Sequence, residues 1–153
     1  MSWTTTVHPW SYDFDYLGHL TAAAYTKAFE QARVEYLRDR WRTRHPAYVV
    51  AAHRLQYRKE ILEETGPLRV VIQPVRVGRS SVDLAELLLD AEGTVCNRSE
   101  ATLVAWDAEA RTARPFTAGE RVSLTADLET DPPPPAAGPS PADTQETEIH
   151  DDC

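Results

Sequence analysis

Residues 12–37 read YDFDYLGHLTAAAYTKAFEQARVEYL, and this stretch changes character at Thr21. Before Thr21, two carboxylates, Asp13 and Asp15, lie among aromatic and aliphatic neighbours, where burial would disfavour their charged form. Such a carboxylate either hydrogen-bonds backbone amides in a turn or is kept partly desolvated because its reactivity is needed. After Thr21 the sequence follows a helical repeat, which decides the architecture.

The repeat after Thr21 predicts a helix of about five turns that ends before Pro46. Its apolar residues recur at steps of three and four, which places on one face Ala22, Tyr25, Phe29, Ala32, Tyr36 and Leu37. Thr21 is a suitable N-cap because its hydroxyl can accept from an amide of the first turn. Glu30 and Arg33 fall on the other side, where we expect a solvated pair.

Beyond Pro46 the period changes to two, which predicts strands. Together with a first strand before the helix, the predicted strands are residues 4–10, 47–62, 68–77, 80–90 and 94–106, and turn signals separate the later runs at Gly66-Pro67, Gly78 and Glu92-Gly93. The last three strands follow one another at hairpin distance, which favours an antiparallel meander, and Pro74 should lie at a sheet edge or a bulge. One long helix and one curved antiparallel sheet of about five strands must cover each other, which gives an α+β domain.

The charge of the chain is concentrated in its last part. The net charge is −8, and the residues from Asp127 onward carry eight acids and no Lys or Arg, so the preceding body is neutral. A neutral body without a basic stripe argues against nucleic acid as the main partner. Six of the eleven prolines also follow residue 131, and a segment of that composition cannot bury enough surface to fold. We therefore expect a folded domain over residues 1–130 and a disordered acidic, proline-rich tail over 131–153.

The cysteines and the N-terminus restrict the class of protein further. Cys96 and Cys153 are the only cysteines, so the sequence has neither a disulfide framework nor zinc-ligand spacing. No cluster of His, Cys, Asp and Glu has metal-ligand spacing, and no metal site is predicted. The N-terminus lacks a charged segment followed by an apolar run, and no apolar segment is long enough to span a membrane. We expect a cytoplasmic protein without a membrane partner.

The motif around Thr21 resembles a family signature. In hotdog-fold acyl-CoA thioesterases of the 4-hydroxybenzoyl-CoA thioesterase type, an Asp-x-x-Gly-His-Val-like loop precedes a Tyr and then a Phe-Glu-x-x-Arg helix. The matching residues here are Asp15, Gly18, His19, Leu20, Tyr25, Phe29, Glu30 and Arg33. A second block over residues 75–107, with a Gly-Arg-Ser-Ser turn at 78–81, resembles the later strands of the family. The resemblance implies a hotdog fold, in which the sheet wraps the central helix and protomers pair edge to edge as a homo-oligomer, either a dimer or a tetramer.

The resemblance also implies the hydrolysis of an acyl thioester at the dimer interface. By position, Asp15 is the carboxylate that attacks the thioester carbonyl or activates water, His19 assists it, and the amide of Ala22 stabilises the oxyanion. The residues assigned to substrate binding are Gly18, Thr21, Tyr25, Arg79, Ser80 and Ser81. No cofactor is implied beyond CoA or phosphopantetheine as part of the substrate. The chemistry agrees, because a thiolate leaves readily and a helix N-terminus offers unpaired amides and the positive end of a dipole.

These assignments have alternatives. Asp13 competes with Asp15, although the spacing from Gly18 favours Asp15, and either carboxylate could instead cap the helix or close a turn. His19 could orient Asp15, contact the substrate or close the loop. The turn at 78–81 could hold the phosphates of CoA or be an ordinary polar turn.

The function also has alternatives, because Thr21-Ala22 stands where many relatives have Asn-Asn, and a side-chain amide that could position substrate or water is missing. The candidates are a thioesterase acting on acyl-CoA or on the acyl or polyketide chain of an acyl carrier protein, a hotdog hydratase or dehydratase, and a non-catalytic acyl-binding protein. The segment from Asp15 to His19 does not match the Asp-x-Asn-Pro-x-His pattern of the hydratases. The presence of Asp15 argues against the binding protein, so the thioesterase is favoured.

Overall fold

The computed structural model describes residues 2–128; the predicted tail over 131–153 and the predicted domain end at residue 130 lie outside them. The elements are β1 (Trp3–Val7), α1 (Ala22–Trp41), β2 (Tyr48–Tyr57), β3 (Leu68–Val77), β4 (Ser81–Leu89), β5 (Val95–Asp107), β6 (Thr112–Ala113) and α2 (Ala118–Ala126), with short 3₁₀ turns at Ser11–Asp13 and Glu63–Thr65. The five predicted strands and the predicted long helix are therefore confirmed. The largest difference in extent is at β2, which ends at Tyr57 rather than at Leu62.

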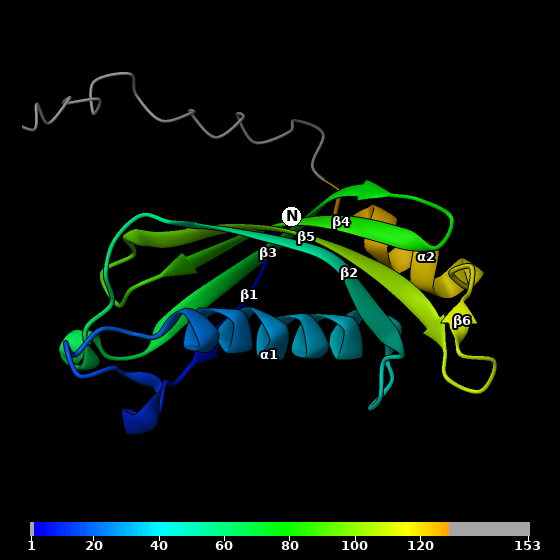
Figure 1. Ribbon diagram of the computed structural model, residues 1–153. Coiled ribbons are helices and arrows are strands. Elements are labelled where there is room, and N and C mark those ends of the chain that lie inside the picture. The colour runs from blue at the N-terminus through cyan, green and yellow to red at the C-terminus, as the bar shows by residue number, and fades with distance from the viewer. Residues whose placement is uncertain (1, 129–153) are drawn as a thin grey trace, which may run out of the picture.

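The strands form one antiparallel sheet in the order β1-β3-β4-β5-β2, with the short β6 beside β5. α1 lies lengthwise along the concave face of this sheet, which arches over it (Figure 1). β3, β4 and β5 are successive antiparallel neighbours, as predicted for the meander. At Pro74 the register with β4 shifts, so the predicted bulge is confirmed, while β3 itself lies inside the sheet. The structure is thus the predicted α+β arrangement.

The buried face of α1 supplies the centre of the core. Four of its residues are completely covered, with 0% exposure: Phe29, Ala32, Tyr36 and Leu37. Thr21 is the N-cap as predicted, and its Oγ1 accepts from the amide of Ala24 at 3.2 Å. Ala22, which the periodicity assigns to the buried face, is exposed, because the first turn of α1 extends beyond the edge of the core.

The prediction of a solvated Arg33 is wrong, because this side chain is buried. It reaches from α1 to β4, where Nε and Nη2 donate to the two carboxylate oxygens of Glu86 at 2.7 and 2.8 Å. Ser99 of β5 donates to the same carboxylate at 2.7 Å, and His53 of β2 hydrogen-bonds Ser99 at 2.8 Å. Burial lowers the pKa of His53, so a neutral imidazole completes a cluster built on one buried ion pair. Glu30 is exposed, as predicted.

Helix α2 is absent from the sequence-based prediction, because it has nine residues and only Leu124 is fully buried. Its start carries a recognisable signal, since Thr117 and Glu120 form a capping box. Asp127, directly after α2, accepts hydrogen bonds from Tyr36 and Arg40 of α1, which anchors the short helix to the long one. No helix within residues 2–128 combines the length and the apolar character needed to cross a membrane.

Candidate active site

The segment before α1 folds into a short hairpin whose tip is the predicted catalytic loop. Three backbone contacts close it: a bridge between Phe14 and Leu20, a hydrogen bond of 2.9 Å from the amide of Asp15 to the carbonyl of His19, and one of 2.9 Å from the amide of Thr21 to the carbonyl of Asp13. Gly18, at φ 77°, takes the left-handed conformation that the tip requires. As a result, Asp13 lies beside the start of α1, and Asp15 lies nearer the tip.

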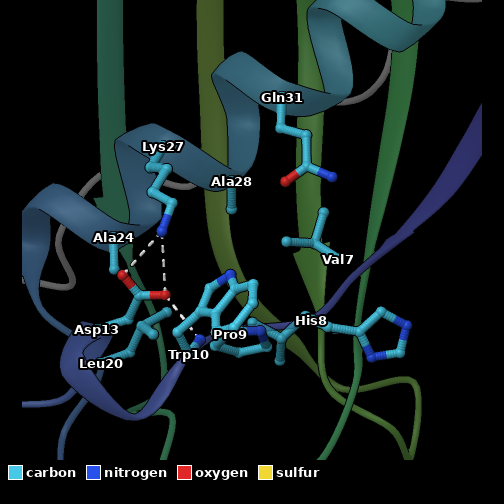
Figure 2. Close-up of a pocket in the computed structure, with 11 residues that line it drawn as sticks. Val7, His8, Pro9, Trp10, Asp13, Leu20, Ala24, Lys27, Ala28 and Gln31 are labelled. Carbon is cyan, nitrogen blue, oxygen red and sulfur yellow. Dashed lines mark hydrogen bonds and ion pairs between the residues drawn. The ribbon is translucent and has the colours of Figure 1, made fainter.

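Asp13 has a structural role. It is 7% exposed, and Figure 2 shows its carboxylate between the backbone of Trp10 and the side chain of Lys27 from α1. Oδ2 accepts from the amide of Trp10 at 2.8 Å, and Lys27 Nζ donates to Oδ1 at 3.1 Å and to Oδ2 at 3.3 Å. The hydrogen bond to Asp13 raises the pKa of Lys27. Because both oxygens of Asp13 are occupied, this residue fastens the loop to the helix and leaves Asp15 as the candidate for chemistry.

Asp15 has one fixed and one free carboxylate oxygen. Oδ1 accepts from the amides of Leu17 at 2.9 Å and His19 at 3.0 Å, which closes the turn. Oδ2 has no hydrogen-bond partner among residues 2–128. Of the two states that the sequence leaves open for this carboxylate, partial desolvation by aromatic neighbours is not found in the single chain, because Asp15 is exposed and the adjacent Tyr16 is 95% exposed. The turn therefore orients the carboxylate without covering it.

The first turn of α1 offers the amides expected of an oxyanion site. In the described part of the chain, the amides of Ala22 and Ala23 have no acceptor, since Thr21 bonds later amides of the turn. The first of them lies at an open pocket of about 340 Å³, lined by His19, Leu20, Ala22, Tyr25, Tyr57, Arg58, Lys59, Glu60 and Ile61. Asp15 is outside this lining, and from the hairpin register its Cα atom lies roughly 10 Å from the Cα atom of Ala22. In the single chain, the carboxylate is therefore not part of the pocket lining at this amide.

His19 and Tyr25 both line this pocket. Nε2 of His19 lies 2.7 Å from Oε2 of Glu60, so only the backbone of His19 contacts Asp15. Of the alternatives left open by the sequence, the structure thus shows loop closure by the backbone, with the imidazole held at the pocket by Glu60. Tyr25 meets Tyr57 edge-on, with ring centroids 5.0 Å apart, and burial raises the pKa of Tyr25 to about 12. The phenol of Tyr25 is therefore neutral at physiological pH.

Arg79, Ser80 and Ser81 lie far from this pocket. They form the turn after β3 and the first residue of β4, whereas the opposite end of β3 pairs with Val7, just before the catalytic loop. A strand of ten residues such as β3 spans roughly 33 Å. Within one chain, the structure therefore does not bring the predicted phosphate-binding turn together with Ala22.

The segment after β2 carries pocket residues that the sequence analysis missed. Its contact with the loop comes from the amide of Leu20, which donates to the carbonyl of Ile61 at 2.8 Å, and from a bridge between His19 and Leu62. This contact joins segments that are distant in the chain, and local sequence does not signal it. The available signal is the run Arg58-Lys59-Glu60, which interrupts the strand alternation where β2 ends.

Comparison with known proteins then identifies the family. A family model described as the thioesterase-like superfamily matches residues 9–139, which is most of the chain. The chain belongs to this superfamily. The hotdog thioesterase family expected from the Asp15 motif is thus confirmed, and membership supports thioester hydrolysis as the class of reaction. A search of curated proteins finds no match.

Solved structures show the same fold as this thioesterase-like chain. A predicted thioesterase from Bacillus stearothermophilus is 19% identical with a TM-score of 0.77, and the match covers 86% of this chain and 100% of that one. A hypothetical protein from Staphylococcus aureus in complex with CoA is 14% identical with a TM-score of 0.77, over 88% and 90% of the two chains. A thioesterase from Thermus thermophilus complexed with coenzyme A and Zn is 25% identical with a TM-score of 0.70, over 80% and 91%.

Proposed function

We propose that this chain hydrolyses acyl-CoA thioesters, with Asp15 as nucleophile or general base and the amide of Ala22 as oxyanion donor. The observation that carries this proposal is the state of the Asp15 carboxylate. Turn amides hold Oδ1, while Oδ2 has no partner among the described residues and is open to a substrate. An oriented carboxylate with a free oxygen suits either catalytic role.

The reaction requires charge stabilisation and bond exchange at one carbonyl carbon. The thioester oxygen would lie at the amides of Ala22 and Ala23, where its developing negative charge meets the helix dipole, and one such donor is typically worth about 3 kcal/mol in the barrier. Asp15 either attacks the carbon, giving a mixed anhydride that water hydrolyses, or takes a proton from the attacking water. The C–S bond breaks, and the thiolate leaves and takes up a proton. The products are the free acid and CoA.

The choice of CoA over a carrier protein rests on charge at the rim of the pocket. Arg58 and Lys59 are exposed there, and Lys59 Nζ contacts Asp90 at 2.9 Å, which leaves Arg58 as the more available cation. CoA carries several phosphate charges, whereas carrier-bound phosphopantetheine carries a single phosphodiester, so an available arginine at the rim favours CoA. The complexes of the Staphylococcus aureus and Thermus thermophilus proteins with CoA agree with this choice.

Arg58→Gln is expected to raise KM for an acyl-CoA about threefold to tenfold and to leave kcat nearly unchanged, because a phosphate contact stabilises substrate and transition state equally. Thiol release is measured with one acyl group attached to CoA, to pantetheine and to a carrier protein. Arg54→Gln is the matched control, since Arg54 of β2 pairs with Glu100 of β5 and does not line this pocket. A higher kcat/KM for the carrier protein than for CoA, or no turnover of any of the three, would contradict the proposal.

We further propose that a dimer completes the site, because one chain leaves Asp15 exposed and keeps the turn at 78–81 far from Ala22. β2 is an edge of the sheet, paired with β5 on one side, and it exposes the apolar side chains of Val49, Val50 and Tyr57. An exposed apolar edge strand is a template for pairing with another chain. Two-fold antiparallel pairing of β2 would set the first residue of one strand beside the last residue of the other. That pairing carries the 78–81 turn of the second copy towards the end of the sheet that holds the catalytic loop.

Val50→Lys is expected to dissociate this dimer, raising its Kd about a hundredfold or more, because the new charges enter an apolar interface. Sedimentation measures the mass, and activity should fall with the dimer fraction as the protein is diluted. Val122→Lys is the control, since Val122 is 69% exposed on α2, away from β2. A wild-type chain that sediments as a fully active monomer would contradict the proposal that two copies of the chain form the active site together.

A further inference from the structure

Asn97 of β5 is a buried polar residue without a protein partner. Its side chain is 0% exposed, and neither Nδ2 nor Oδ1 has a hydrogen-bond partner among residues 2–128. Buried amide groups are nearly always paired, because an unpaired group loses its hydration without compensation. An amide in this state within a core therefore requires a physical reason, and recognition of a ligand is such a reason.

The strand register sets Asn97 beside the proposed active site. The residues directly opposite Asn97 are Tyr57 on β2 and Leu88 on β4. Directly opposite residues point to the same face of a sheet, with Cβ atoms about 5 Å apart. Tyr57 in turn contacts Tyr25 of α1, and both rings line the pocket at Ala22. Asn97 therefore lies on the helix side of the sheet, next to the tyrosine pair of that pocket.

The next polar residue on the same face shows that this core can supply hydrogen-bond partners to buried polar side chains. Ser99, two positions along β5, donates to Glu86 at 2.7 Å and is hydrogen-bonded to His53 at 2.8 Å. This network does not extend to Asn97, since in the described structure no member of it hydrogen-bonds the amide. The unpaired amide is thus a local feature of the end of the core that faces the pocket.

We propose that Asn97 recognises a hydroxyl group on the acyl part of the substrate. A side-chain amide offers two N–H donors and a carbonyl acceptor, so its best complement is a group that donates and accepts at once. A hydroxyl does both, whereas a keto oxygen leaves Oδ1 unpaired and an alkyl chain leaves both atoms unpaired. This inference rests on the proposed thioesterase function and narrows its substrates to hydroxylated acyl groups.

The route to Asn97 passes Tyr57. This residue is the last of β2 and lies outside the buried core cluster, so its ring can turn aside at the end of the paired strands without disturbing the core. Tyr25 is buried in the opposite wall and stays in place. With the ring of Tyr57 turned aside, an acyl group lies against Tyr25 and its hydroxyl meets Asn97.

The test uses pairs of acyl-CoAs, aliphatic and aromatic, whose members differ by one hydroxyl group. The measured quantity is the ratio of kcat/KM for the hydroxylated member to that for the plain member. We expect this ratio to exceed about ten in the wild type for at least one pair, and to fall about tenfold or more in Asn97→Leu, an apolar variant of similar volume. Asn97→Leu should also unfold at an equal or higher temperature, because it removes unpaired polar atoms from the core.

Cys96→Ala is the matched control, because Cys96 is the buried neighbour of Asn97 in the bulge of β5, and it should leave the ratio unchanged. If Asn97→Leu does not fold, Asn97→Ala takes its place. A ratio that falls less than about tenfold, or a wild type that prefers no hydroxylated member, overturns the role of Asn97. If no thioester is hydrolysed, the proposed function fails, and the ratio of Kd values for the same pairs, measured by calorimetry, still decides the role of Asn97.

Discussion

Asp15→Asn is expected to lower kcat for acyl-CoA hydrolysis by about 10²- to 10⁴-fold and to change KM by less than about threefold. Asparagine keeps the size of the side chain and an oxygen at the position of Oδ1, so the hydrogen bonds from the amides of Leu17 and His19 persist and the turn is retained. The substitution removes the negative charge, and with it both the nucleophile and the general base. Release of free thiol at saturating acyl-CoA measures the loss, and thermal unfolding confirms that the fold is unchanged.

Asp13→Asn is the matched control for this experiment. Its oxygens are occupied by Lys27 and by the amide of Trp10, so the substitution should lower the unfolding temperature and reduce kcat less than about tenfold. A larger loss for Asp13→Asn than for Asp15→Asn would transfer the catalytic role to Asp13. If Asp15→Asn keeps more than about a tenth of the wild-type kcat, Asp15 only closes the turn, and the non-catalytic acyl-binding alternative gains support.

Arg33→Leu and Glu86→Leu are each expected to lower the free energy of unfolding by about 3–5 kcal/mol. Each side chain is at most 1% exposed, and each single substitution leaves the other charge buried without its partner. The double substitution should cost much less than the sum, because no isolated charge remains and two apolar side chains fill the space. Urea unfolding of the wild type, both single variants and the double variant gives the coupling energy.

The exposed pair Arg54–Glu100 is the comparison for this double-mutant cycle of Arg33 and Glu86. Its side chains are each 67% exposed and 3.9 Å apart, and removing it should change the free energy of unfolding by less than about 1 kcal/mol. A similar small value for the buried pair would mean that Ser99 or water compensates the remaining charge. A change in the urea m-value of a single variant would indicate that the fold itself is altered.

The sheet and the long helix are predictable from the sequence because their signals are periodic. The change from a helical repeat to a period of two at Pro46 separates α1 from the strands, and β3, β4 and β5 are bounded by glycine-containing turns. Pro74 predicts its own bulge, since it lacks the amide that a regular ladder requires. The N-cap at Thr21 is equally local. Features of this kind depend on neighbouring residues, and the sequence contains all of them.

The parts that were not predictable depend on distant contacts. The spacing of Arg33 from Glu30 is typical of an exposed ion pair on a helix. Its burial is explained only by the position of Glu86 on β4, which is set by the tertiary structure. Likewise, the pocket at Ala22 is completed by the segment after β2, and a single chain gives no sign of what lies across the edge of the sheet. The motif therefore singles out Asp15 as the candidate catalytic carboxylate, but it does not predict the surroundings of that side chain.

The two edges of the described sheet are not equivalent. β1 is a strand of five residues with three consecutive threonines, and it covers one half of β3. α2 lies over the other half, where Gln73 donates to the carbonyl of Asp127 and Arg121 donates to the carbonyl of Gly78. Long open strands invite repeated addition of further molecules, whereas short or covered strands prevent it. In the dimer proposed through β2, both outer edges would be the short β1 strands, so this edge opposes the addition of further molecules and growth into a fibril.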